Sequence, residues 1–200
     1  MEIYLIRHTT PAIDKGICYG QTDLDVTETF EQEMAKTKEY LPGNIQTVYS
    51  SPLQRCTKLA RALFPDHSIQ LHEDLMELKC GDWEMQLWDK IPKTEIQPWM
   101  DDFINVPVPN GESYEQMHER VVNRFQQVTQ QPGPVVIVAH GGVLRSIVAH
   151  ITNTPLKESF EVFSFHYGCV VKLVLYEDRF AHEILYNVSL AGKEWHRPTL

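Results

Sequence analysis

The sequence predicts an α/β fold with three layers, α/β/α, around a mainly parallel central sheet. Short apolar runs typical of buried strands alternate along the chain with amphipathic stretches typical of helices, a pattern that favours parallel strands covered on both faces. Two of these runs, at 2–6 and 134–139, lead into the histidines His8 and His140. Two further strand-like runs follow each other near the C-terminus, which indicates an antiparallel hairpin at one edge of the sheet.

The first strand is followed by a helix. The apolar run EIYLI at 2–6 is the predicted strand, and it places Arg7 and His8 at its tip. From Val26 onward, apolar residues recur near helical spacing until Pro42-Gly43 ends the pattern, which predicts a helix between these points.

A second strand and helix follow. Residues 45–49 form the predicted strand, and Ser50-Ser51-Pro52 is typical of an N-cap with proline at the first helical position. Arg55 is therefore expected in the first turn of a helix. The apolar residues of this helix share one face: Leu53, Cys56, Ala60 and Leu63.

Residues 73–110 differ from the rest of the chain. They hold three of the four tryptophans and four prolines, and only short helical patterns such as 83–90. We expect one domain over residues 1–200, in which residues 78–110 are inserted as a small cap.

The clearest helix follows this insertion. Ser113 and Gln116 form a capping box, and the apolar residues of 114–128 fall on one stripe. The strand at 134–139 then ends at His140-Gly141-Gly142, and a helix over 143–151 comes next.

The tail supplies the hairpin, with strands at 169–176 and 180–188 joined by Glu177-Asp178-Arg179. In parallel sheets covered by helices, ligands bind beyond the carboxyl ends of the strands. His8 and His140 are both expected at that edge, which makes it the candidate site.

Composition excludes several classes of protein. A formal charge of -9 argues against a nucleic-acid surface, because phosphate backbones are bound by clustered basic residues. The four cysteines contain no C-x-x-C pair, so neither a zinc site nor a disulfide framework is indicated. The start MEIYLIRH lacks the features of a signal peptide, and no apolar stretch is long enough to span a membrane. We expect a cytoplasmic protein without a bound metal or cofactor.

The residues at this edge suit phosphoryl transfer. A phosphomonoester is a dianion, and Arg7 and Arg55 can neutralise it with bidentate guanidinium groups, aided by helix N-termini after Pro52 and Gly141. A neutral imidazole at His8 can then form a phosphoenzyme. The leaving alkoxide needs a proton, and Glu77, with apolar neighbours in sequence, is the candidate carboxylic acid.

Five segments carry a family resemblance, in order and over nearly the whole chain: LIRHTTP at 5–11, SSPLQRCTKLA at 50–60, ELKCGDWE at 77–84, PNGES at 109–113 and VAHGGVLRSIVAH at 138–150. They resemble the motifs of the histidine phosphatase superfamily, also called phosphoglycerate mutase-like. The resemblance implies that His8 is the phosphorylated nucleophile and that Glu77 is the proton donor. It also implies that Arg7, Arg55 and His140 hold the phosphate.

Within this superfamily, RHTTP and GICYGQTDLDVT at 16–27 are similar to alpha-ribazole phosphatases, which dephosphorylate alpha-ribazole 5'-phosphate during assembly of the lower ligand of cobalamin. Four positions depart from the superfamily pattern. Thr9 stands where glycine is usual, and Phe30, Leu59 and Asn110 replace other usual residues. We expect the changes at Phe30, Leu59 and Asn110 to affect packing or a turn rather than the chemistry, and we do not expect Thr9 to abolish activity.

Other functions remain open. A broad-specificity sugar or metabolite phosphatase, or a phosphoglycerate mutase, would use the same pocket. Only 31 residues separate Glu77 from Pro109, and this short cap favours hydrolysis over a mutase. A 2H phosphoesterase would use the two H-x-T patterns beginning at His8 and His150, which would leave Arg55 and Glu77 without a role. The last alternative is a non-catalytic binding module. All the residues assigned to catalysis are present, which argues against it.

Tyr19 and Gln21 are the best candidates for contacts with the substrate, because their loop follows the nucleophile strand. The expected partner is a small phosphomonoester, with no nucleic acid and no membrane. The sequence leaves the natural substrate, the oligomeric state and the role of His166 undecided.

Overall fold

A computed structural model describes residues 1–177 and 179–188, and within them six strands form one sheet in the order β3-β2-β4-β1-β5-β6. Strands β3, β2, β4 and β1 are parallel, while β5 is antiparallel to β1 and β6 is antiparallel to β5. The mainly parallel sheet with an antiparallel edge is therefore confirmed. The strands are β1 (Glu2–Arg7), β2 (Thr47–Ser50), β3 (Ile69–Leu71), β4 (Val135–Ala139), β5 (Val170–Tyr176) and β6 (Arg179–Tyr186).

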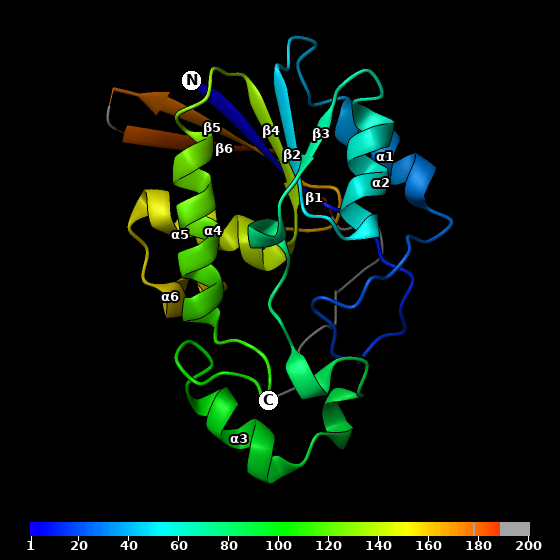
Figure 1. Cartoon of the computed structure of the whole chain (residues 1–200), viewed down its shortest axis with the longest axis vertical. Helices are drawn as coiled ribbons and strands as arrows, with labels where there is room; N and C mark the ends of the chain where they lie inside the picture. Colours follow the sequence, from blue (N-terminus) through cyan, green and yellow to red (C-terminus); the bar gives the residue numbers. More distant parts are fainter. Residues whose placement is uncertain (178, 189–200) are drawn as a thin grey trace.

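Helices cover both faces of the sheet, because its central strands carry apolar side chains on both sides. Along β4, Ile137 belongs to one core cluster, whereas Val136 and Val138 belong to the other. Figure 1 shows α1 and α2 on one side of the sheet and α4, α5 and α6 on the other. These helices are α1 (Phe30–Lys38), α2 (Gln54–Leu63), α4 (Tyr114–Val128), α5 (Gly141–Thr152) and α6 (Leu156–Val162), and a short helix η1 (Glu73–Leu75) precedes the insertion.

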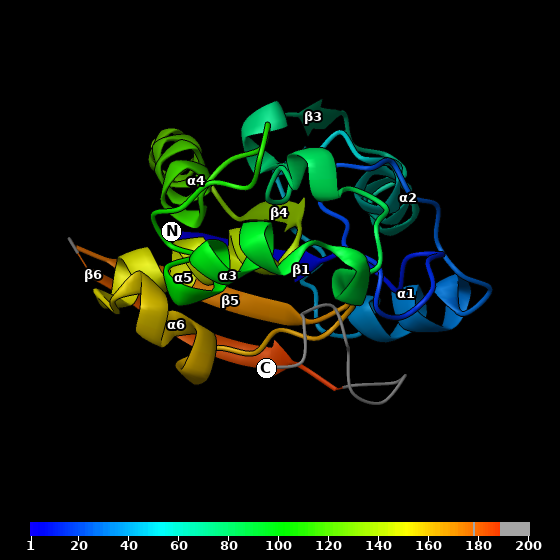
Figure 2. The ribbon, with the colours of Figure 1, turned by 90° about the horizontal axis from the view of Figure 1, so that it is seen from below.

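The 78–110 segment adds no strand to the sheet and lies beyond the carboxyl ends of the parallel strands (Figures 1 and 2). It contains η2 (Gly81–Trp83), η3 (Trp88–Lys90) and α3 (Lys93–Asp101). Its own apolar cluster is built on three tryptophans, with the rings of Trp88 and Trp99 stacked 5.9 Å apart. The expectation of only short helical patterns missed α3. Pro92 precedes this helix, where a missing N–H costs nothing, and Pro98 lies only three residues before its end.

Two predicted helix starts were wrong. The first helix begins at Phe30 rather than near Val26, which instead forms a β-bridge with Pro11. The helix α2 begins at Gln54, and its first-turn amide donates to the Asp23 carboxylate at 2.7 Å. That N–H is therefore already bonded, so it does not serve the phosphate as expected. The capping group comes from a loop 31 residues away, which the local pattern could not reveal.

Other predicted elements are confirmed. Ser113 and Gln116 form the capping box of α4 through both reciprocal hydrogen bonds. The hairpin of β5 and β6 is present, and Asp178 in its connection lies outside the described residues. Two short elements, β3 and α6, were not predicted. No helix in the ranges 1–177 and 179–188 is both long enough and apolar enough to cross a bilayer.

Three of the four departures from the superfamily pattern are accommodated by packing and turn geometry. Leu59 is fully buried in the cluster between the sheet and α2, and Phe30 packs against the same cluster. Asn110 has a φ of 55°, in the left-handed region that asparagine tolerates better than most residues.

Candidate active site

The two histidines meet because their strands are neighbours. Arg7 ends β1 opposite Ala139, which ends β4, so His8 and His140 leave the sheet side by side. Their ring centroids are 5.0 Å apart at 63°. His8 is 2% exposed and His140 is fully buried, and a buried imidazole pair at a strand edge is not a surface feature. The predicted juxtaposition is therefore present.

The tautomer of His8 follows from its backbone contact. Its Nδ1 lies 2.7 Å from the carbonyl oxygen of Thr9, which can only accept a hydrogen bond. Nδ1 must then carry the proton, and in the neutral ring the lone pair resides on Nε2. This is the tautomer that a nucleophilic Nε2 needs.

His140 is held as a neutral ring. Its Nε2 lies 2.8 Å from the hydroxyl oxygen of Ser51 and 3.5 Å from the sulfur of Cys56. Burial lowers the pKa of His140 well below its usual range, and the nearby positive charge of Arg55 acts in the same direction. Burial also raises the pKa of the Cys56 thiol to about 12, so this neighbour stays uncharged as well. Ser51, expected to cap α2, instead orients His140.

Arg55 is a buried cation on the first turn of α2, as predicted. Its guanidinium donates to the carbonyl oxygens of Thr22 at 2.8 Å and Gly20 at 2.6 Å. Within the described part of the chain, its Nε has no hydrogen-bond partner and no carboxylate forms a salt bridge with it. A buried charge without a counter-ion is costly, so this arrangement favours an anionic ligand.

Arg7 is fixed by the loop that leads into β5. Its Nη1 donates to the carbonyl oxygen of Phe165, and its guanidinium carbon lies 3.9 Å from the centroid of the Tyr167 ring. The Tyr167 hydroxyl is in turn 2.9 Å from the hydroxyl of Tyr19, whose ring lies 5.6 Å from the guanidinium carbon of Arg55. The two tyrosines thus bridge the two arginines.

Tyr167 was not among the predicted site residues. The topology contains the signal that would have found it: β5 begins at Val170, opposite Ile6, and runs antiparallel to β1. The residues that precede β5 must therefore lie beside the tip of β1, where the Tyr167 ring is 5.4 Å from that of His8.

Glu77 reaches the same edge from the start of the 78–110 segment. Its carboxylate accepts from the backbone N–H of Gly142 and from that of Leu78, each at 3.0 Å. A Cβ on Gly142 would lie 2.3 Å from Oε1 of Glu77, so only glycine permits this approach. Because the Gly142 amide at the start of α5 is bonded to Glu77, it does not serve the phosphate as expected.

The two predicted substrate contacts lie in the loop between β1 and α1. Gln21 donates from Nε2 to the carbonyl oxygen of Glu77 at 3.0 Å, and Tyr19 belongs to the aromatic bridge. The structure brings both side chains next to the candidate site. Their contact with a substrate stays a prediction.

The structure opposes the two-histidine alternative. His150 lies ten residues after His140 along α5, which corresponds to about 15 Å of helix. Its ring neighbours are those of His118 and Phe125 rather than that of His8.

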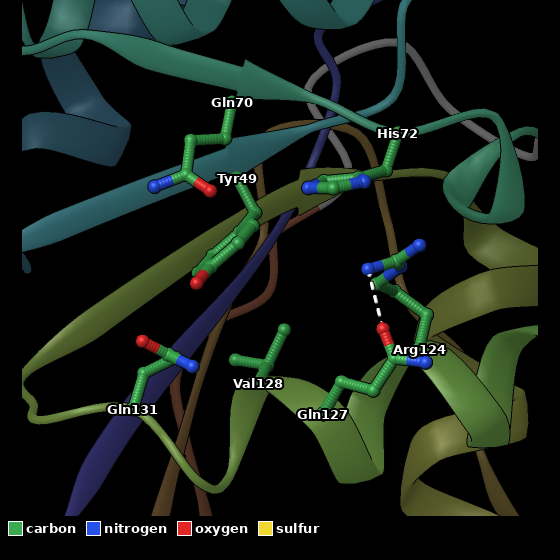
Figure 3. A pocket seen from close by; sticks show the side chains of 7 residues that line it. All are labelled: Tyr49, Gln70, His72, Arg124, Gln127, Val128 and Gln131. Carbon is green, nitrogen blue, oxygen red and sulfur yellow. Dashed lines mark hydrogen bonds between the residues drawn. The ribbon is translucent and has the colours of Figure 1, made fainter.

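A pocket of about 210 Å³ lies elsewhere, between the β2–β3 edge and α4 (Figure 3). None of the predicted site residues lines it. Its arginine, Arg124, is paired with the Asp74 carboxylate at 2.6 Å and also donates to Gln127. Burial lowers the pKa of His72, a second potential cation in this pocket. The pocket therefore differs from the histidine edge, where Arg55 is buried without a carboxylate partner among the described residues. Its lining residues are Tyr49, Gln70, His72, Arg124, Gln127, Val128 and Gln131.

Comparison with known proteins agrees with this geometry. The profile of the family described as "Histidine phosphatase superfamily (branch 1)" matches residues 3–188. A protein of Hydrogenobacter thermophilus named "Putative phosphoserine phosphatase 2" is 30% identical over 80% of this chain and 83% of its own length. The "Metal-independent phosphoserine phosphatase" of Arabidopsis thaliana is 29% identical over 76% and 69% of the two chains.

Solved structures share the fold. The alpha-ribazole phosphatase of Shigella flexneri superposes with a TM-score of 0.84 and 21% identity, covering 96% of this chain and 100% of that one. The family match spans almost the entire described chain and includes every residue of the histidine edge. The chain belongs to the histidine phosphatase superfamily, branch 1, and is a phosphatase of that superfamily.

Proposed function

We propose that this phosphatase hydrolyses alpha-ribazole 5'-phosphate through a phosphohistidine formed on His8. The observation that carries the phosphoryl chemistry is the position of His8, buried next to His140, a ring on which the charges of both Arg55 and Arg7 act. The finer choice of substrate is supported by the similarity of residues 16–27 to alpha-ribazole phosphatases and is consistent with the shared fold.

In the first step, Arg7 and Arg55 neutralise the oxygens of the phosphoryl group, and Nε2 of His8 attacks phosphorus. The P–O bond to the leaving alcohol breaks as the N–P bond forms. Glu77, in its acid form, gives its proton to the departing oxygen. His140 donates a hydrogen bond to a phosphoryl oxygen as a neutral ring, so the site gains no further charge.

In the second step, the Glu77 carboxylate takes a proton from water as that water attacks phosphorus. The N–P bond breaks, inorganic phosphate leaves, and His8 and Glu77 return to their starting states. Because Glu77 is held by the N–H of Gly142, close to His140, one carboxyl group serves both steps.

We place the 78–110 segment over this edge as a cap that surrounds the leaving alcohol, with Tyr19 and Gln21 as contacts. We place the activity in the cytoplasm, because free thiols suit a reducing compartment. The four free and buried cysteines are Cys18, Cys56, Cys80 and Cys169.

The test is a panel of phosphomonoesters ranked by kcat/KM: alpha-ribazole 5'-phosphate, phosphoserine, 3-phosphoglycerate, sugar phosphates and nucleotides. Alpha-ribazole 5'-phosphate is expected to rank first. Phosphoserine is the second candidate, because the relative from Hydrogenobacter thermophilus carries that activity in its name. A preference for phosphoserine would replace the proposed substrate, and equal rates would indicate a broad-specificity phosphatase. Conversion of 3-phosphoglycerate to its 2-isomer would indicate a mutase.

A further inference from the structure

The carboxylate of Glu84 accepts several hydrogen bonds, although the proposed mechanism gives this residue no role. It follows η2 in the 78–110 segment and accepts from three consecutive backbone N–H groups of the β1–α1 loop. These are Gly20 at 3.1 Å, Gln21 at 2.8 Å and Thr22 at 3.3 Å. The Thr22 hydroxyl and the N–H of Cys80 also donate to it. One acid therefore shapes the whole turn of the loop.

The other side of the same loop holds Arg55. The carbonyl oxygens of Gly20 and Thr22 accept from its guanidinium at 2.6 and 2.8 Å. The peptide unit between Gly20 and Gln21 joins the two charges directly, because its N–H donates to Glu84 and its C=O accepts from Arg55. In a trans peptide these two groups point in opposite directions, so the peptide dipole is aligned between an anion and a cation.

The β1–α1 loop is tightly packed where it meets the start of the 78–110 segment. A Cβ on Gly20 would lie 1.8 Å from the carbonyl oxygen of Leu78, so the backbone of the loop is packed directly against the start of the 78–110 segment. The Gly20 and Thr22 carbonyls are the only hydrogen-bond acceptors of Arg55 within the described residues. The position of these carbonyls therefore sets the direction of the guanidinium.

We propose that Glu84 is a positioning residue that orients the Arg55 guanidinium toward the phosphoryl group by fixing the Gly20–Thr22 backbone. The inference rests on the proposed function, in which Arg55 binds the phosphate. The proposed mechanism places Glu84 on none of the reacting atoms, and Arg55 is the phosphate-binding side chain that the Gly20–Thr22 backbone holds. Glu84 should therefore change the binding of phosphate in general, whatever alcohol is attached to it.

The first test is Glu84→Gln. The amide keeps one acceptor oxygen but turns an NH₂ group toward the backbone donors. Some of the N–H groups of residues 20–22 are then left without a hydrogen-bond acceptor. We expect kcat/KM to fall about 10- to 100-fold, by the same factor for p-nitrophenyl phosphate and for an alkyl phosphate. The affinity for inorganic phosphate, measured by calorimetry, should weaken in parallel. Asp82→Asn is the matched control. It removes an equal charge two residues before Glu84, and the Asp82 carboxylate is exposed and accepts a hydrogen bond from the side chain of Asn110. This control should leave both quantities unchanged.

The second test asks whether the effect passes through Arg55. Arg55→Lys should by itself reduce kcat/KM severely, because lysine lacks the planar fork. In the Arg55→Lys protein, adding Glu84→Gln should then lower kcat/KM by less than a further threefold. If the two substitutions acted independently, their losses of kcat/KM would multiply. Multiplying losses, or a Glu84→Gln protein with normal phosphate affinity, would overturn the inference and leave the proposed function intact. An Arg55→Lys protein with normal activity would instead overturn the phosphate site itself.

The near-ultraviolet circular dichroism of the tryptophans, of which Trp83 adjoins Glu84, reports whether the segment is folded. Should Glu84→Gln fail to fold, Glu84→Asp takes its place, because aspartate keeps both oxygens on a shorter side chain. We expect a several-fold loss of phosphate affinity for Glu84→Asp, and a normal affinity would again contradict the inference.

Discussion

The Glu77 carboxylate accepts a hydrogen bond from the backbone N–H of Gly142, with 3.0 Å between Oε2 and the nitrogen. This bond ties the candidate acid to the first turn of α5, directly after His140. Where this carboxylate lies therefore depends on a glycine that is not itself part of the chemistry.

Gly142→Ala tests that dependence. A Cβ at this position would lie 2.3 Å from Oε1 of Glu77 and 3.0 Å from Cε of Met117, so the carboxylate must move. Since alanine favours a helix more than glycine does, the fold should persist. Displacing a catalytic group by about 1 Å can cost about 100-fold, and we expect a loss approaching this in kcat/KM for alkyl phosphates. Gly43→Ala, where nothing lies within 4 Å of the new Cβ, is the control and should retain full activity. An active Gly142→Ala protein would show that Glu77 need not occupy this position.

Glu77→Gln separates a proton donor from a structural carboxylate. Glutamine keeps the shape but supplies no proton, so turnover of alkyl or sugar phosphates should fall about 10²- to 10⁴-fold. Formation of the phosphoenzyme from p-nitrophenyl phosphate, followed as a burst of nitrophenolate, should be spared, because that leaving group is a weak base. The burst is needed because Glu77 also activates water in the second step. Equal losses of burst rate for both kinds of substrate, in a folded protein, would remove Glu77 from the role of acid.

The burial of His140 predicts a loss of stability in mild acid. Its pKa in the folded protein is lowered from the usual value of 6.5. Below about pH 6.5 the unfolded chain binds a proton that the folded chain excludes, so the free energy of unfolding falls as the pH falls. His72 and His118, whose pKa values are also lowered by burial, act in the same direction. The measurement therefore compares wild type with His140→Gln by urea unfolding at pH 7, 6 and 5. The variant should lose less stability across this range, and parallel slopes would contradict a neutral buried His140.

Local patterns were enough to predict five of the six strands, the capping box of α4 and the position of the two histidines. An apolar run and the polar group at its tip are adjacent in sequence, and parallel neighbours bring such tips together. The start of α2 and the role of Ser51 depart from prediction because of contacts at long range. Asp23 caps α2 across 31 residues, and Ser51 meets His140 across 89. No periodicity carries such information.

The same reason explains the residues that were missed. Tyr167 enters the site only because β5 pairs with β1 in an antiparallel register. Glu84 stands within the quoted motif ELKCGDWE, yet its partners lie in a loop more than 60 residues earlier, so its part in the site appears only in the fold.

The most direct test of the account is the chemical identity of the covalent intermediate. A phosphomonoester with a labelled phosphoryl group is mixed with the enzyme and quenched within the first turnover, in the presence of a chelator. The account predicts label that survives base, is lost in acid, maps to His8 by mass spectrometry and is absent from His8→Ala. Label on Ser51 or Cys56, or hydrolysis that requires an added metal ion and leaves no labelled protein, would contradict it.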